Sequence, residues 1–165
     1  MVLGEKQEVF EKLLRSFEAY FDLAEDVTLH GVTYDATGEF HSRSEKYVLS
    51  KKAQLWAAEN HEYIYFVVLD TLEEEAVRFY GRSAIDEGMA CIKPHSEHMY
   101  SYISLIFITD RITEEAAALL QKTNYRKQFL LTFHGWMEFR AVAYECASGR
   151  MLYNRSGKAL SKQLI

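Results

Sequence analysis

The stretch VVLDTLEEEAV, residues 67–77, runs from β-branched residues through Asp70 into a row of glutamates. Forty positions later FITDRITEEAA, residues 107–117, repeats this plan with Asp110 at the junction. An apolar, β-branched run predicts a buried strand, and acidic residues directly after it favour the positive end of a following helix. Two such junctions with a further β-rich run behind them predict strand, helix, strand, helix, strand, which is the order of parallel crossover units.

The two aspartates allow two interpretations. If the apolar strands are parallel neighbours, Asp70 and Asp110 lie at one carboxyl edge of the sheet, where open α/β sheets bind ligands. Together they could hold a divalent cation such as Mg²⁺, which accepts one or two protein carboxylates. The alternative is structural: Thr71 with Glu74 matches a capping box, Thr113 starts the second helix, and the helix dipole attracts the acidic residues. We favour the structural interpretation, because helix-start physics accounts for every identity that the stretches share.

Upstream of these stretches, the sequence predicts a helix and then a β-meander. An amphipathic helix is expected over residues 5–24, where large apolar side chains recur at helical spacing between charges. Residues 27–69 are typical of three or four strands, with turn signals at 35–38 and 58–61. The last strand, residues 63–69, is apolar or aromatic at every position, which predicts helices on both faces of the sheet.

A long helix is predicted between the two junction strands, over about residues 72–92, and Pro94 ends it. Its apolar stripe is narrow and consists mostly of small residues. We therefore interpret Gly81 and Gly88 as positions that let the helix approach the sheet closely, although glycine lowers helix propensity. The remaining elements of this βαβα segment, residues 62–122, are a strand over 99–109 and a helix over 113–122.

Hairpins are predicted at the C-terminal end, over residues 125–154. His134–Gly135 is interpreted as a two-residue turn with glycine where positive φ is needed, which sets Leu131 opposite Glu138. Glu138 and Arg140 then form a charged pair on an otherwise apolar surface. We interpret it as an ion pair at the sheet edge, because exposed pairs of this kind are common and weak.

The whole chain, residues 1–165, is predicted to form a single three-layer α/β (or α+β) domain. Its mixed β-sheet combines the β-meander, the parallel βαβαβ segment and the C-terminal hairpins, and three helices flank it. Ser148–Gly149 predicts a second tight turn, and residues 155–165 are expected to be a loose tail. A chain of 165 residues that is 48% hydrophobic can build one core, and it contains no linker-like stretch.

Charge and cysteine content restrict the partners and the compartment. The net charge of −5 argues against nucleic acid as a partner, and the basic stretches at 44–52, 124–128 and 154–163 are interpreted as solvated faces. No apolar run approaches the roughly 18 residues that cross a bilayer, so we expect no membrane association and a cytoplasmic location. Cys91 and Cys146 show no paired spacing, which predicts buried, reduced thiols without a disulfide.

The stretch KPHSEH, residues 93–98, is a candidate metal site. His95 and His98 flank a serine and a glutamate, and imidazole nitrogens are common zinc ligands. A zinc site needs three or four ligands, however, and the other four histidines show no spacing that completes the set. We expect an exposed polar loop here. The chain also has no nucleophile elbow and no glycine-rich phosphate loop, so nucleotide hydrolysis of the familiar kind is excluded.

The order of elements resembles the restriction-endonuclease-like PD-(D/E)XK fold. A leading helix, a β-meander, a helix, a strand running into FITDRITEEAAALL (residues 107–120) and a strand-turn in QFLLTFHGWMEF (residues 128–139) follow this plan. The resemblance covers about residues 62–139 and rests on topology. It implies a metal-dependent nuclease site with an aspartate on one strand and Glu-x-Lys on the next.

The residues at the implied nuclease positions depart from the motif. Asp35 is the plausible first aspartate and Glu62 the glutamate, but Ile64 stands where the lysine belongs. Glu45 and Lys46 are adjacent and lack the motif's spacing. Since the lysine and the carboxylates together bind the metal and orient the attacking water, the resemblance implies the fold without an intact nuclease motif.

We therefore expect a cytoplasmic binding or assembly module, without an intact catalytic motif, that self-associates through an aromatic-rich surface. The chain has twenty-three aromatic residues (ten Phe, eleven Tyr, two Trp), more than the core of one small domain needs, so some are expected at an interface. The alternative is a metal-dependent phosphodiesterase or nuclease that uses Asp70 and Asp110, or the weaker pair Asp35 and Glu62, with a divalent cation such as Mg²⁺.

Overall fold

The computed structural model describes the backbone of residues 4–48 and 53–164, and the side chains in these ranges except those of residues 43–58. The helices are α1 (Glu5–Phe17), α2 (Glu74–Cys91), α3 (Glu114–Lys122) and α4 (Lys158–Ser161). The strands are β1 (Asp22–Leu29), β2 (Val32–Val48), β3 (Ala53–Leu72), β4 (His98–Ile112), β5 (Arg126–Gln128), β6 (Trp136–Glu145) and β7 (Arg150–Tyr153).

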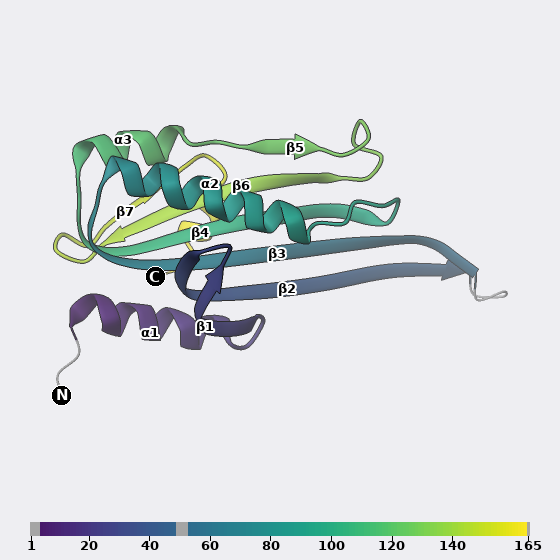
Figure 1. Cartoon of the computed structure of the whole chain (residues 1–165). Helices are drawn as coiled ribbons and strands as arrows, with labels where there is room; N and C mark the ends of the chain where they lie inside the picture. Colours follow the sequence, from purple (N-terminus) through teal and green to yellow (C-terminus); the bar gives the residue numbers. More distant parts are fainter. Residues whose placement is uncertain (1–3, 49–52, 165) are drawn as a thin grey trace.

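The strands form one mixed sheet in the order β1-β2-β3-β4-β6-β5, and β7 also pairs with β6. Strands β3, β4 and β6 run parallel, whereas β1, β2, β5 and β7 pair antiparallel with their neighbours. Helices α2 and α3 connect the parallel strands, so the predicted βαβαβ segment is confirmed. The meander and the second C-terminal hairpin are also present, which makes this a single mixed-sheet α/β domain (Figure 1).

Helices cover both faces of the sheet, as Figure 1 shows: α2 and α3 lie on one side and α1 on the other. Alternation along β3 places Tyr63, Tyr65 and Val67 in the core beneath α2 and α3, and Ile64 and Phe66 in the core beneath α1. All five side chains are buried. The prediction from the continuous apolar run of a strand covered on both faces is confirmed.

The boundaries in the N-terminal half differ from the prediction. Helix α1 ends at Phe17, seven residues early, because β1 begins at Asp22 and pairs with β2. The expected turns at 35–38 and 58–61 lie inside β2 and β3. Gly38 serves close packing, since a Cβ there would lie 2.7 Å from Leu23 and 2.9 Å from Ile64.

The turn that joins β1 to β2 is His30–Gly31. Both residues have positive φ, 48° and 79°, as two-residue hairpin turns of the primed type require. This turn was not predicted, because the turns of the β-rich stretch 27–69 were expected at 35–38 and 58–61.

The two helix starts behave differently. Thr113 caps α3 as predicted, and its hydroxyl accepts a hydrogen bond from the Ala116 amide at 3.1 Å. Thr71 caps nothing: β3 continues through Leu72, and Glu73 occupies the N-cap of α2 without a side-chain cap bond. The predicted capping box at Thr71 is therefore wrong, because pairing between β3 and β4 extends past that threonine.

The two glycines of α2 also differ. A Cβ at Gly88 would lie 2.5 Å from the Ile103 side chain, so this glycine lets the helix approach β4 as predicted. A Cβ at Gly81 would meet no atom within 4 Å, and the same interpretation is wrong there.

The first C-terminal hairpin is not the tight one that was predicted. Strand β5 has only three residues, and the connection to β6 runs over residues 129–135. Register places Arg126 opposite Glu138, where the two-residue turn would have placed Leu131. The second turn is confirmed at Ser148–Gly149, with φ of 72° at the glycine.

The segment after β7 is ordered through Leu164, contrary to the expected loose tail. Helix α4 buries Leu160 against the α1 face of the sheet. Of the two cysteines, both free, Cys146 is buried as predicted but Cys91 is exposed at the last residue of α2. No helix in the described part of the chain is long and apolar enough to span a bilayer.

Candidate functional site

Asp70 and Asp110 do share one edge of the sheet. Leu69 pairs with Thr109 and Thr71 with Arg111 in the parallel register, which places the two aspartates side by side at the carboxyl ends of β3 and β4. Lys6 of α1 reaches this edge, where its ammonium donates to Asp70 and, at 2.8 Å, to Asp110 Oδ2.

The Lys6 ammonium occupies the space in which a cation would bind the two carboxylates. Its hydrogen bond lowers the pKa of Asp70, and the bonds to Asp110 and Asp70 raise the pKa of Lys6. The Asp70 side chain is 91% exposed and that of Asp110 50%, so no closed cleft surrounds them. The arrangement holds the start of α1 against the sheet, as a surface ion-pair cluster does.

Asp35 and Glu62, the second candidate pair, bind different partners. Asp35 accepts a hydrogen bond from the Val68 amide at 2.7 Å, and burial raises the pKa of its carboxyl. Glu62 pairs with Arg140 and accepts from the Ser104 hydroxyl at 3.0 Å. Each carboxylate has a local structural role. The Glu45–Lys46 dipeptide lies outside the described side chains.

Glu62, Ser104 and Arg140 form a charged row across the three parallel strands, on the face that α1 covers. The Arg140 Nε donates to Ser104 Oγ at 3.0 Å, and its guanidinium lies 4.1 Å from the centre of the Tyr102 ring. Burial lowers the pKa of Arg140 to about 10, so it stays charged at neutral pH. The predicted pairing of Arg140 with Glu138 is wrong, since Glu138 pairs with Arg126 at 2.7 Å.

An apolar groove lies beside this row. Its volume is about 450 Å³, and it opens between the end of α1 and β2. Its apolar lining is aromatic: Phe17, Tyr20, Phe21 and Phe40. Tyr20 is 74% exposed at the rim, so the groove offers accessible aromatic surface.

His95 and His98 do not converge on a common point. His98 is buried, and both of its ring nitrogens already have partners: the His134 carbonyl at 2.6 Å and Ser101 Oγ at 2.7 Å. Burial lowers the pKa of its imidazole. His95 contacts Glu59 at 2.8 Å, and its ring centre lies 6.5 Å from that of His98. The prediction of an exposed polar loop is therefore wrong for His98, which is buried, whereas the side chain of His95 is partly exposed.

Two further histidines, which the sequence did not single out, contact each other with their rings edge to face. His41 of β2 and His61 of β3 are cross-strand partners, with 2.6 Å between their Nδ1 atoms. With Glu39, Glu59 and His95, they line a depression of about 590 Å³. The sequence carries no local signal for this pairing, because the register of β2 with β3 includes an irregularity between Lys46 and Tyr47. The turns that were predicted at 35–38 and 58–61 also gave a different pairing of these strands.

The β5–β6 turn carries three of the four most exposed large apolar side chains of the described chain, the fourth being Tyr20. Leu130, Leu131 and Phe133 are 65%, 84% and 76% exposed. Leu130, Leu131 and Thr132 also have positive φ, at 48°, 51° and 77°, a conformation that costs about 1–2 kcal/mol for each non-glycine residue. Four backbone hydrogen bonds within residues 129–135 hold the turn in this form.

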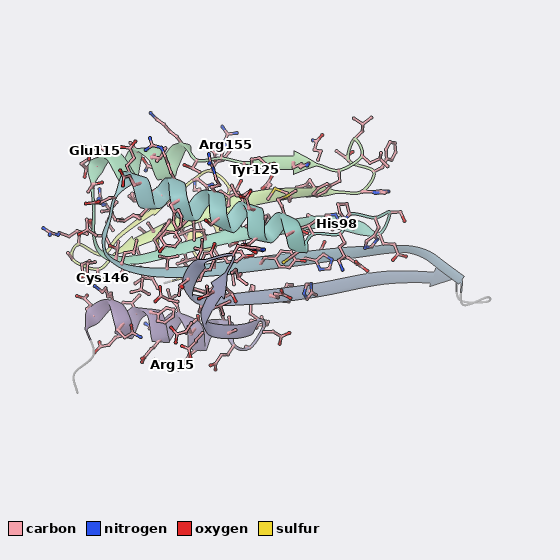
Figure 2. The ribbon with its side chains drawn as sticks, in the orientation of Figure 1. Arg15, His98, Glu115, Tyr125, Cys146 and Arg155 are labelled. Carbon is pink, nitrogen blue, oxygen red and sulfur yellow. The ribbon has the colours of Figure 1, made fainter. Side chains whose placement is uncertain are left out.

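Figure 2 marks the two ends of the sheet that these sites occupy. Cys146 labels the carboxyl end, where it follows β6 and donates its amide to the Thr109 carbonyl near Asp110. His98 labels the opposite end, beside the last turn of α2. Within the described ranges, no group of three or more His, Cys, Asp and Glu side chains is arranged to hold a metal ion.

A comparison with curated proteins finds no match. A family model, described as Domain of unknown function (DUF8052), matches residues 5–164, which extends from the first residue of α1 past α4 and includes every strand of the sheet. The chain therefore belongs to the DUF8052 family.

Proposed function

We propose that this protein is a binding or assembly module that self-associates by inserting the β5–β6 turn of one copy into the aromatic groove of another. The observation that carries the proposal is the turn itself, whose three large apolar side chains are exposed on a backbone held in a left-handed conformation. Backbone strain of this kind persists where the surrounding structure enforces it, and it concentrates at functional sites.

The turn has the properties of an interface anchor. Interface energy concentrates in a few large side chains that enter a pocket, and a rigid anchor loses little conformational entropy on binding. Leu131 at 84% exposure is the tip, with Leu130 and Phe133 beside it. Gly135 fixes the base of the turn, since a Cβ there would lie 2.2 Å from the Met99 carbonyl oxygen.

A second copy is the partner we propose, because the same chain carries an apolar groove of matching chemistry. The groove between α1 and β2 is lined by Phe17, Tyr20, Phe21 and Phe40. The turn is at one end of the sheet and the groove lies against α1. Reciprocal insertion closes a dimer, and one-way insertion builds a ring or a chain of copies.

The cytoplasm is the proposed compartment. Both cysteines are free, and Cys91 is exposed at the end of α2. An exposed free thiol is typical of a reducing compartment, where disulfides are rare.

The metal-dependent phosphodiesterase or nuclease is the alternative proposal. Its support is the convergence of Asp70 and Asp110 on a single ammonium, since a position that attracts one cation suits another. We rank it second, because Lys6 satisfies both carboxylates and the edge is open to solvent.

The test is sedimentation velocity over a wide concentration range, with one variant on each side of the contact. Leu131→Asp places a charge on the turn, and Tyr20→Asp places one at the rim of the groove. Both side chains are largely exposed, so both variants should fold. We expect the wild type to associate as concentration rises and each variant alone to remain monomeric.

An equimolar mixture of the two variants is the sharper experiment. It contains intact turns on one chain and intact grooves on the other, so association should reappear, at lower affinity than in the wild type. The control is Phe79→Asp, which removes an apolar side chain 53% exposed on α2 and should associate like the wild type. A monomeric wild type, or a mixture that stays monomeric, would overturn the proposed contact.

A further inference from the structure

The histidines at the amino end of the parallel strands form a chain of contacts that self-association does not use. Glu39 lies 3.3 Å from Nε2 of His41, whose Nδ1 faces Nδ1 of His61 at 2.6 Å. Nε2 of His61 lies 3.4 Å from Glu59, which also contacts His95 at 2.8 Å. The two central imidazoles therefore present the same nitrogen to each other and their opposite nitrogens to carboxylates.

Without a metal ion, the contacts of His41 and His61 require the two imidazoles to carry different numbers of protons. Two facing Nδ1 atoms form a hydrogen bond when one carries a proton and the other a lone pair. The histidine that donates through Nδ1 must also carry a proton on Nε2 to contact its carboxylate, so it is a cation. Its partner must be neutral.

A metal ion satisfies the same groups symmetrically. With an ion between the rings, both Nδ1 atoms present lone pairs to it and both Nε2 atoms donate to Glu39 and Glu59. A carboxylate behind each ligating histidine fixes the tautomer and raises the basicity of the imidazole. This second arrangement leaves no ring nitrogen of His41 or His61 without a suitable partner.

The position is open to solvent, and a small movement of the rings makes it wide enough for an ion. Two nitrogens that bind one ion at about 2.0–2.1 Å lie about 3 Å apart, so the rings must separate by a few tenths of an ångström. His41 can make this adjustment, since 46% of its side chain is exposed, whereas His61 is 19% exposed and held against the stacked ring of His98. The adjoining depression leaves the remaining coordination positions to water.

We propose that His41 and His61 bind one divalent transition-metal ion through their Nδ1 atoms, with Glu39 and Glu59 as the partners of their Nε2 atoms. Imidazole ligands select Cu²⁺, Ni²⁺ and Zn²⁺ over Mg²⁺ and Ca²⁺, which take oxygen ligands. Within the ordinary order of affinities, Cu²⁺ binds more tightly than Ni²⁺ or Zn²⁺. This site differs from the predicted pair of His95 and His98, because both ring nitrogens of His98 already form structural hydrogen bonds.

The test is isothermal titration of the full chain with Cu²⁺, Ni²⁺, Zn²⁺ and Mg²⁺, each alone. The Leu131→Asp background keeps the protein monomeric, so a failure of the proposed self-association does not affect the result. We expect one Cu²⁺ per chain, weaker Ni²⁺ and Zn²⁺ binding and no Mg²⁺ binding. His41→Ala and His61→Ala should each raise the Cu²⁺ dissociation constant at least tenfold, and Glu39→Gln should raise it about tenfold.

His30→Ala is the matched control, because His30 is an exposed histidine that also contacts a glutamate, Glu87, but faces no second imidazole. It should bind Cu²⁺ like the parent. The electron paramagnetic resonance spectrum of the Cu²⁺ complex should show coupling to two imidazole nitrogens and to fewer in either alanine variant. Absence of Cu²⁺ binding, or equal affinity in the His41, His61 and His30 variants, would overturn the proposal. Circular dichroism checks that each variant is folded.

Discussion

The two ends of the parallel strands use their polar side chains in opposite ways. At the carboxyl end, Asp70 and Asp110 bind Lys6, and the result is a contact between α1 and the sheet. At the amino end, His41 and His61 bind each other above an open depression, and the nearby β5–β6 turn leaves its apolar side chains in solvent.

This difference runs against the common rule that open α/β sheets bind ligands at the carboxyl ends of their strands. The rule depends on loops and helix starts that leave a crevice at that edge. Here the lysine of α1 fills the position between the two aspartates. Instead, β2 and β3 extend past the end of α1 toward the amino end of the parallel strands, where residues 43–48 pair with residues 53–59 (Figure 1).

The largest expected effect tests whether the charged row between the two ends is structural. Glu62→Ala leaves the buried Arg140 without its carboxylate, which should lower the free energy of unfolding by about 3–5 kcal/mol. Urea denaturation measures this loss. The double variant Glu62→Leu, Arg140→Leu should recover most of it, because neither charge is then buried. An unstable double variant together with a stable Glu62→Ala would contradict a structural role.

The next effect concerns the strained turn at the amino end. Gly135→Ala combines positive φ with a clash against the Met99 carbonyl, and it should destabilise the fold by about 2 kcal/mol or more. Gly149→Ala is the matched control at φ of 72°, where a Cβ meets nothing within 4 Å, and about 1 kcal/mol is expected. Equal losses in urea denaturation would mean that close packing at Gly135 contributes nothing.

A smaller effect tests the ion pairs at the carboxyl end. Lys6→Met should lower the melting temperature only slightly, because exposed ion pairs are weak. The pKa of Asp70 is depressed in the folded state, so its contribution is present above its unfolded pKa and is lost as pH falls through the folded value. The gap between the two melting temperatures, measured by calorimetry, should persist from pH 5 to 8 and close below about pH 4. A gap that widens in acid would contradict this assignment.

The last prediction is that a divalent cation has no effect at the carboxyl end. Mg²⁺ should leave the melting temperature of the wild type unchanged, because Lys6 already occupies the position between Asp70 and Asp110. A melting temperature that rises with Mg²⁺, and no longer rises in Asp70→Asn, would favour the phosphodiesterase alternative. Both ends of the sheet would then bind a metal ion.

Much of the fold was predictable where local patterns and tertiary contacts agree. The continuous apolar runs of β3 and β4 predicted buried parallel strands, and the Thr113 cap was visible in the sequence. Prediction failed where pairing extended a strand past a local signal. Thr71 matched a cap but belongs to β3, and Gly38 matched a turn but lies inside β2.

The candidate sites were harder to predict for the same reason. The edge shared by Asp70 and Asp110 follows from two parallel strands, and the sequence predicted it. Lys6 could not be assigned to that edge, because nothing local indicates where α1 lies against the sheet. The pairing of His41 with His61 needed the register of a long hairpin, and the notable spacing of His95 and His98 pointed to a different pair.

The sequence by itself determined the alternation of strands and helices, the apolar composition of the core strands and the acidic starts of α2 and α3. These depend on side chains within a few residues of each other, whose hydrogen bonds and periodicity are readable along the chain. Only the tertiary structure decided which charges meet. Lys6 and Asp110 are 104 residues apart, and Glu62 and Arg140 are 78 apart. Such pairs depend on strand register and helix placement, which follow from packing the whole core at once.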